Sequence, residues 1–245
     1  MESAHGVIQH RSPTRILAVC VILIAVAAMT GLGFWQLDRM TQKERRLASI
    51  AQKHTGEPMS LTHALRAVTD PRDTQVQFNG TPDPARIMYL DNRVVEGQVG
   101  YDIVVPVRTD VGWVLVNYGW IKAGQRRAYL PEVILAGTSR TFAGVLSKPG
   151  QNPMVTETAD TAQFPLRIQA LDPEFLSTLL KMPLVPYVVV LTRDDPRFKR
   201  QWSPVVMPPE KHLGYAIQWF GLAIAAFIVG LLALRKKGSN HDTSA

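Results

Sequence analysis

Two long uncharged apolar runs, one near each end of this 245-residue chain, constrain its fold more than any other feature. They cover residues 16–37 and 213–234. Each is close to the ~20 residues that an α-helix needs to cross a hydrocarbon core of ~30 Å. A helix also satisfies its own backbone hydrogen bonds, which lipid cannot do. The sequence therefore predicts two transmembrane helices.

The first run raises the alternative of a cleaved signal peptide, because basic residues precede it and small residues lie inside it. The apolar core of a signal peptide usually has about 7–15 residues. This run is longer and continues without a break to Leu37. We therefore expect an uncleaved membrane anchor.

The two runs divide the chain into five parts. The segment between them is long enough to form one domain with its own hydrophobic core. The expected order is an N-terminal tail (1–15), a transmembrane helix (16–37), an extramembrane domain (38–212), a second transmembrane helix (213–234) and a basic C-terminal tail (235–245).

The formal net charge of +7 raises the question of a nucleic-acid partner, but the basic residues gather beside the apolar runs. That position favours contacts with lipid headgroups over nucleic acid. Because both sides of both runs are basic, charge counting alone leaves the orientation open. The positive-inside rule holds for short segments, so we give the short tails more weight and expect both termini in the cytoplasm. The flanking residues are Arg11, Arg15, Arg39, Lys43, Arg45, Arg46, Arg197, Lys199, Arg200, Arg235, Lys236 and Lys237.

The central segment has the pattern of an α+β domain. Helical spacing continues past the first run to about residue 53, Ser60 can cap a short helix over 61–67, and Asp172 can cap another that ends near residue 181. Between them we expect an antiparallel sheet or partial barrel, including a hairpin whose turn is residues 109–112. The expected strands are 75–78, 86–90, 101–108, 113–121, 140–146, 164–170 and 184–192.

Signatures of common enzyme classes are missing from the sequence. It contains no Gly-x-Ser-x-Gly, no His-Glu-x-x-His and no glycine-rich phosphate loop. The adjacent acids Asp194 and Asp195 precede Pro196 and are typical of a solvated turn. Cys20 is the only cysteine, so no intrachain disulfide or cysteine metal cluster can form. The sequence therefore favours a protein that is not an enzyme.

His212 is the histidine with the most informative position, because it directly precedes the second apolar run. It can anchor the helix at the membrane interface, or it can donate its imidazole to a haem iron. Tyr215 and Trp219 follow at offsets of three and seven, on the same helix face. Aromatic rings there suit a flat macrocycle and equally suit the aromatic belt of a membrane protein. The residues alone leave both readings open.

Four segments together resemble the surfeit locus protein one family of cytochrome c oxidase assembly factors. The resemblance covers about residues 15–235, and the segments stand in the family's order. One departure is Tyr118, because the family commonly has arginine at that position, so a role for that charge is in doubt here. The segments are GFWQLDR (33–39), GYDIVVP (100–106), VLVNYGWI (114–121) and KHLGYAIQWF (211–220).

The resemblance implies a membrane-anchored assembly factor that binds haem a and assists its insertion into the catalytic subunit of cytochrome c oxidase. It implies His212 as the haem ligand, and we expect Trp35, Tyr215 and Trp219 near the ring and Arg39 or Lys211 at the propionates. Haem a synthase is a further candidate partner. The resemblance implies that the central domain lies in the periplasm of a bacterium or in the intermembrane space of a mitochondrion. The N-terminal tail has no extended Arg/Ser-rich transit segment, so we expect a bacterial inner membrane.

Three other functions remain as alternatives to haem transfer. The first is a haem-free scaffold that stabilises an oxidase assembly intermediate. A membrane-tethered enzyme is disfavoured because no set of nucleophile and base is recognisable. A sensor is disfavoured because the short C-terminal tail carries no output domain. Haem content after purification distinguishes the scaffold from the haem-binding factor.

Overall fold

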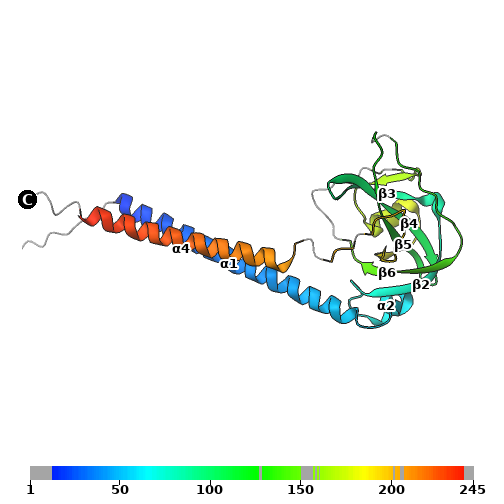
Figure 1. The fold of residues 1–245 in the computed structure, drawn as a ribbon, viewed down its shortest axis with the longest axis horizontal. Helices are drawn as coiled ribbons and strands as arrows, with labels where there is room; N and C mark the ends of the chain where they lie inside the picture. Colours follow the sequence, from blue (N-terminus) through cyan, green and yellow to red (C-terminus); the bar gives the residue numbers. More distant parts are fainter. Residues whose placement is uncertain are drawn as a thin grey trace, which may run out of the picture. The chain divides into compact units, whose positions relative to one another are not determined.

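The apolar runs lie in two long helices, α1 (Pro13–Lys53) and α4 (Pro209–Ser239), in the computed structural model of the chain (Figure 1). Both are long and apolar enough to cross a membrane, and only 6% and 17% of their most apolar windows are buried. This exposure of apolar side chains favours a membrane location. The predicted continuation of the first helix to residue 53 is confirmed. The structure describes residues 13–126, 129–149, 157, 159, 161–200, 202–204 and 207–239.

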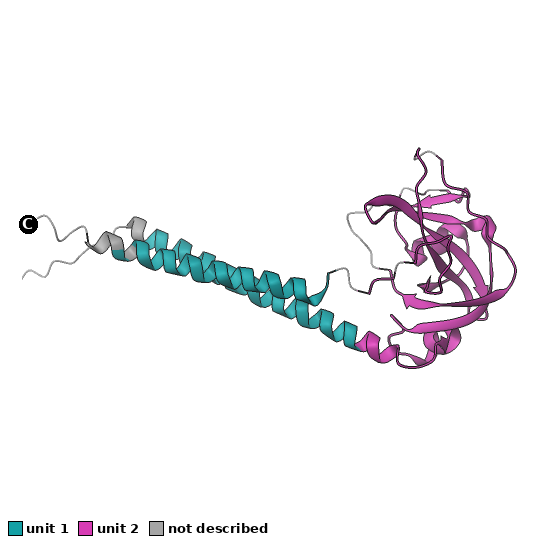
Figure 2. Cartoon of the chain, viewed as in Figure 1, with its two compact units in different colours: residues 1–48, 205–245 teal, residues 49–204 magenta. Residues whose placement is uncertain are grey.

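The chain divides into two compact units, residues 1–48 with 205–245 and residues 49–204 (Figure 2). In the first unit α1 and α4 pack on each other through small residues. A Cβ on Gly33 would lie 2.5 Å from the ring of Phe220, and a Cβ on Gly230 would lie 2.9 Å from Ile22. Glycine at these points lets the helix backbones approach closely. Most of the expected tails, residues 1–12 and 240–245, lies outside the described residues.

The second unit is built on a mixed β-barrel of five strands, which confirms the α+β class. The strands follow the order β2-β6-β8-β5-β4, and the pairing of β2 with β4 closes the ring. We expected an antiparallel sheet or partial barrel. The ring differs from the antiparallel pattern at one pairing, because β5 and β8 run parallel. These strands are β2 (Gln75–Pro82), β4 (Gln98–Thr109), β5 (Gly112–Lys122), β6 (Arg140–Ser147) and β8 (Leu184–Leu191).

Three short strands extend this ring. β1 (Met59–Ser60) adds to β2, while β3 (Met88–Val95) adds to β4 and β7 (Leu166–Ile168) adds to β3. One edge of β4 pairs with β5, and its other edge is long enough for two partners. The first part of that edge pairs with β3, and Val107 and Arg108 near its end pair with β2. The barrel therefore closes through the end of β4, which pairs with β2, and β3 lies outside the closed ring.

The barrel strands are almost continuously apolar because both of their faces are buried. Val105 of β4 and Val116 of β5 belong to a core that fills the barrel. Their neighbours Val104 and Leu115 belong to a second core, which α3 (Pro173–Leu180) covers from outside. Since successive side chains of a strand point to opposite faces, a strand buried on both faces loses the polar alternation of a surface strand.

Local signals placed the short helices correctly. In α2 (Leu61–Ala67) the Ser60 side chain accepts from the backbone N–H of His63. In α3 the Asp172 carboxylate caps the first turn, and the helix ends at Lys181, which is left-handed with φ 53°. Capping of this kind satisfies backbone groups that have no partner within the helix. Both predicted helices are confirmed.

Two strand predictions differ from the structure. The strand expected over 86–90 begins only at Met88, because a 3₁₀ turn, η1 (Pro84–Arg86), precedes it. The strand expected over 164–170 is reduced to β7. We also missed the hairpin between β3 and β4, whose turn residues Glu96 and Gly97 both have positive φ, 50° and 74°. The first position of such a turn usually has asparagine, aspartate or glycine. Here it has Glu96, so the sequence lacks the usual turn signal.

Candidate functional site

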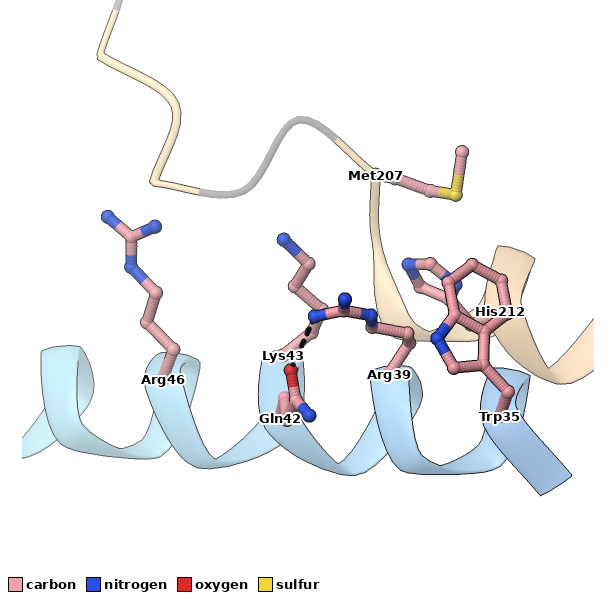
Figure 3. Close-up of a pocket in the computed structure, with 7 residues that line it drawn as sticks. All are labelled: Trp35, Arg39, Gln42, Lys43, Arg46, Met207 and His212. Atoms are coloured by element: carbon pink, nitrogen blue, oxygen red, sulfur yellow. Dashed lines mark hydrogen bonds between the residues drawn. The ribbon is translucent and has the colours of Figure 1, made fainter. Parts of the chain in front are cut away.

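A hollow of about 420 Å³ lies in the first unit, between the part of α1 that follows the apolar run and the start of α4. We call it the His212 pocket. Its α1 residues recur at the spacing of one helix face, so successive turns present them to the same space. Figure 3 shows Trp35, Arg39, Lys43 and Arg46 directed to the same side of α1. The lining residues are Trp35, Arg39, Gln42, Lys43, Arg46, Met207 and His212.

His212 is the only one of these lining residues that is buried, with 8% of its surface exposed. Its Nδ1 lies 2.7 Å from Oε1 of Gln36, one turn before Arg39 on α1. Because an amide oxygen only accepts, Nδ1–H is the donor in this contact, and in the neutral ring this leaves a lone pair on Nε2. Nε2 is buried and has no hydrogen-bond partner among the described residues. Burying such a group without a partner costs free energy, so this atom suits an electrophile.

The rest of the pocket is positively charged. Arg39, Lys43 and Arg46 line it, and no carboxylate is among the lining residues that the structure describes. The Arg39 guanidinium lies 5.5 Å from the centre of the Trp35 ring, and its Nη1 donates to Oε1 of Gln42 at 2.9 Å. The cations on this face attract anionic groups, and arginine binds carboxylates in a fixed planar geometry.

Comparison with known proteins gives the family. The model of the SURF1 family matches residues 23–224, most of the chain. The chain belongs to the SURF1 family. This confirms the resemblance seen in the sequence, and membership implies a role in the assembly of cytochrome oxidase. Assembly factors of this family are not enzymes.

Curated SURF1-like proteins of Rickettsia align over nearly their whole length. The one from Rickettsia felis is 24% identical over 223 residues, which cover 88% of this chain and 96% of the relative. The one from Rickettsia prowazekii is 24% identical over 228 residues and covers 90% of both chains. The one from Rickettsia conorii is 23% identical over 227 residues. The family match over residues 23–224 includes the barrel and reaches into both apolar helices.

In this SURF1 family chain the predicted site residues fall into two groups. Trp35, Arg39 and His212 line one pocket. Tyr215 is 44% exposed and Trp219 is half-buried, one and two turns further along α4, and neither is among the lining residues. Lys211 is exposed and is also not among them.

Two cations of the pocket, Lys43 and Arg46, were expected only in the basic flank of the first run. Gln36, which contacts His212, was not among the predicted site residues. The signal was available, because the helix was expected to continue to residue 53 and these positions share the face of Arg39. The contact between Gln36 and His212 could not be read in the same way, since 176 positions separate the two residues.

The arrangement suits a metal with one protein ligand better than a metal cage. No group of three or more His, Cys, Asp or Glu side chains that could hold an ion occurs in the described part of the chain. A haem iron needs only one axial ligand from the protein, because the porphyrin supplies the equatorial ones. The buried lone pair of His212 and the three cations thus fit an iron and the carboxylates of one molecule. Since Nε2 is buried, binding requires neighbouring side chains to move.

Proposed function

We propose that this SURF1 family chain is a membrane-anchored, non-enzymatic assembly factor that carries haem a to the catalytic subunit of cytochrome c oxidase. The observation that carries the proposal is the buried Nε2 of His212, which has no partner among the described residues and whose ring is oriented by Gln36. Position alone left His212 as either a ligand or an interface anchor. An anchor is expected to turn its polar atoms to water or headgroups, and Nε2 is shielded from both.

Each residue of the pocket has a defined part in this proposal. Nε2 of His212 donates its lone pair to the iron, and Gln36 holds the ring in the Nδ1-protonated form by accepting a hydrogen bond from Nδ1–H. Arg39, Lys43 and Arg46 pair with the two propionates, whose charge is then compensated beside the apolar run. Trp35, with the Arg39 guanidinium beside it, contributes apolar contact area. Haem a is the cargo of such a factor, and a site with one axial ligand and exposed cations favours its release.

The proposal includes a location and an orientation. The two apolar helices support a membrane location, and the relatives that match are bacterial. We propose the inner membrane of a bacterium, with both termini in the cytoplasm and the barrel in the periplasm, because the basic residues at the outer ends of the two apolar runs follow the positive-inside rule. Haem a synthase is the partner that would supply the cargo.

The direct test is the absorbance spectrum of the full-length protein purified from cells that make haem a. We expect a haem a band in the wild type and its loss in His212→Ala. His63→Ala is the matched control, because His63 is an exposed histidine of the barrel unit and is not among the residues that line the His212 pocket. The far-ultraviolet circular dichroism of all three proteins should agree.

Two outcomes would contradict haem binding at His212. One is a band of equal strength in His212→Ala. The other is a wild type without haem that still co-purifies with the oxidase subunit, which would favour the haem-free scaffold.

A further inference from the structure

A second hollow, of about 210 Å³, lies in the barrel unit, and we call it the Arg200 pocket. Its aromatic wall comes from Tyr118 of β5 and Phe142 of β6, which are only 1% and 3% exposed. The segment that follows β8 supplies the other side. Lys199 in that segment exchanges two backbone hydrogen bonds of 2.8 Å with Trp120 of β5, so the segment is fixed to the barrel. The hollow is therefore part of the folded unit.

Arg140, at the start of β6, is held against the aromatic wall. Its Nη2 donates to the hydroxyl of Tyr118 at 2.9 Å. Its guanidinium lies 5.5 Å from the centre of the Tyr118 ring and 5.0 Å from that of Phe142. The Tyr118 hydroxyl accepts a hydrogen bond from Arg140, so its own O–H remains available to donate to a ligand. One side of the pocket thus presents a fixed cation and a hydroxyl group.

Arg200 forms the opposite side and has one nitrogen without a partner. Its Nε donates to the carbonyl of Arg193 at 2.7 Å, and its guanidinium lies 5.7 Å from the Phe198 ring. Nη1 is buried and has no acceptor among the described residues. Burial lowers the pKa of the Arg200 guanidinium, yet an arginine stays charged. A buried donor of a charged group without an acceptor is costly.

The nearby carboxylates compensate for this charge only in part, because burial lowers the pKa of Arg200 by more than Asp195 and Asp194 raise it. Asp195 accepts from Arg197 at 3.0 Å and 2.7 Å through its two oxygens. The hydrogen bond from Arg197 lowers the pKa of Asp195 to about 2, so that pair is ionised and complete. Asp194 is exposed. Three arginines, Arg140, Arg193 and Arg200, then line the pocket against one uncommitted carboxylate, an excess of two positive charges.

We propose that the Arg200 pocket binds a phosphate group, either free or as the headgroup phosphate of a lipid. Three guanidinium groups from different parts of the chain, with the Tyr118 hydroxyl, suit an anion that offers several oxygens in different directions. A phosphate monoester at neutral pH carries a charge of about −1.5 to −2, and free phosphate carries a similar charge, which matches the excess charge of the pocket. The phosphodiester of a lipid headgroup carries a single negative charge and would compensate part of that excess. A carboxylate has only two oxygens, and one arginine fork already satisfies it. This inference is independent of haem binding.

The test uses the full-length protein in a phosphate-free maltoside detergent, titrated with inorganic phosphate against chloride at equal ionic strength. Binding to the native state raises the melting temperature until the site is filled. We expect a saturable rise in the wild type and a midpoint at least about tenfold higher in Arg200→Gln, because a charge-assisted hydrogen bond is lost. Arg66→Gln removes an exposed arginine of α2 outside the pocket and should behave as the wild type.

A general stabilisation by phosphate, which acts by exclusion from the protein surface, would be the same in all three proteins and would not saturate. That result overturns the proposal. If Arg200→Gln fails to fold, Arg140→Gln removes the opposite cation and should raise the midpoint in the same way. An unchanged midpoint in Arg140→Gln would also contradict it.

A second arm distinguishes the two sources of phosphate. In nanodiscs of phosphatidylglycerol, a lipid phosphate in the pocket would abolish the response to inorganic phosphate and would stabilise the wild type relative to Arg200→Gln without added ion. A free phosphate would give the same titration in nanodiscs and in detergent. Both results support a phosphate site. No saturable response in detergent, together with no difference between the proteins in nanodiscs, would exclude one.

Discussion

The two pockets each contain a buried nitrogen without a hydrogen-bond partner among the described residues, but the two atoms have opposite chemistry. In the His212 pocket Oε1 of Gln36 accepts a hydrogen bond from Nδ1–H, so Nε2 of the neutral ring offers a lone pair. In the Arg200 pocket Nη1 offers a proton on a cation. The first atom suits an electrophile such as a metal, and the second suits an anion. A buried nitrogen without a partner therefore indicates a ligand class only after the hydrogen bonds of the rest of its side chain are known.

The scaffolds of the two pockets also differ. The His212 pocket lies between two helices that pack through side chains, with Gly33 against the ring of Phe220. The Arg200 pocket lies against barrel strands whose backbones are in direct contact. A Cβ on Gly144 of β6 would lie 2.4 Å from the carbonyl oxygen of Val190 in β8. Side chains can rotate and a paired backbone cannot, so the barrel should tolerate less change.

The largest expected effect is a loss of barrel stability when a methyl group is added where two backbones are in contact. Gly144→Ala should destabilise the barrel by about 3 kcal/mol, at the upper end for an overpacked core, because the contact is with backbone. Gly33→Ala is the matched control. The Phe220 ring can turn away, and alanine favours the helix by about 1 kcal/mol over glycine, so the barrel transition should not move. Urea unfolding of the full-length proteins, followed by the circular dichroism of the strands, measures both. Equal midpoints for the two variants would contradict the comparison.

The features of the fold that could be predicted were the local ones. Length and apolarity identify α1 and α4, and capping residues identify α2 and α3. The hairpin of β4 and β5 follows from two β-branched segments around Gly112. The closure of the barrel could not be predicted, because it depends on Thr81 and Pro82 pairing with Arg108 and Val107. The parallel pairing of β5 with β8 is equally non-local. No periodicity within a single segment encodes these registers.

The site residues also divide into those that local sequence features predict and those that depend on contacts between distant segments. Trp35, Arg39 and His212 were recognised from motifs that lie next to the apolar runs, and the structure places them in one pocket. Gln36 was overlooked because its contact joins two distant helices. The Arg200 pocket was not predicted at all, and Asp194 and Asp195 were read only as a solvated turn. The structure places that turn beside arginines of two other segments.

The second prediction concerns the lone pair on His212. If Gln36 sets the position of the ring proton, Gln36→Leu should weaken haem a binding by about 10–100-fold, the usual effect of removing a residue that orients a metal ligand. Gln218→Leu is the matched control, because Gln218 is exposed on α4 and does not line the pocket. Titration of haem a into the detergent-solubilised proteins measures the affinity.

The protonation of the His212 ring can also be measured without haem, so the role of Gln36 can be tested independently of haem binding. The nitrogen chemical shifts of labelled His212 report which ring nitrogen is protonated without any haem. We expect one tautomer, protonated on Nδ1, in the wild type and a mixture in Gln36→Leu. The same mixture in the wild type would show that Gln36 does not control the ring.

The third prediction concerns the wall of the Arg200 pocket. Tyr118→Phe removes the hydroxyl that accepts from Arg140, and it should destabilise the barrel by about 1 kcal/mol. Burial raises the pKa of Tyr118, so the hydroxyl is neutral and protonated near pH 7. Phosphate binding should weaken several-fold because Arg140 loses its anchor. Tyr129→Phe, at a 69% exposed tyrosine, should change neither quantity.

The smallest expected effect tests whether Asp195 is committed to Arg197. The hydrogen bonds from Arg197 lower the pKa of Asp195 to about 2, below its ordinary 3.8. Folding then favours the ionised form, so this pair stabilises the barrel above about pH 4 and loses that contribution as the pH falls toward 2. Because Arg197 is 55% exposed, we expect only about 0.5 kcal/mol. Other carboxylates titrate in the same range, among them Asp70, whose pKa Arg72 also lowers to about 2.

The measurement is therefore the difference in unfolding free energy between the wild type and Asp195→Asn, followed from pH 6 down to pH 3 in phosphate-free buffer. It should shrink as the pH falls, since protonation makes the wild type resemble the variant. Asp70→Asn gives the same comparison for an ion pair outside the Arg200 pocket. In Asp195→Asn the freed Arg197 adds a cation beside the pocket, so phosphate should bind no more weakly than in the wild type. Weaker binding would mean that Asp195 helps to form the site instead of merely neutralising Arg197, and the charge argument for the Arg200 pocket would then be wrong.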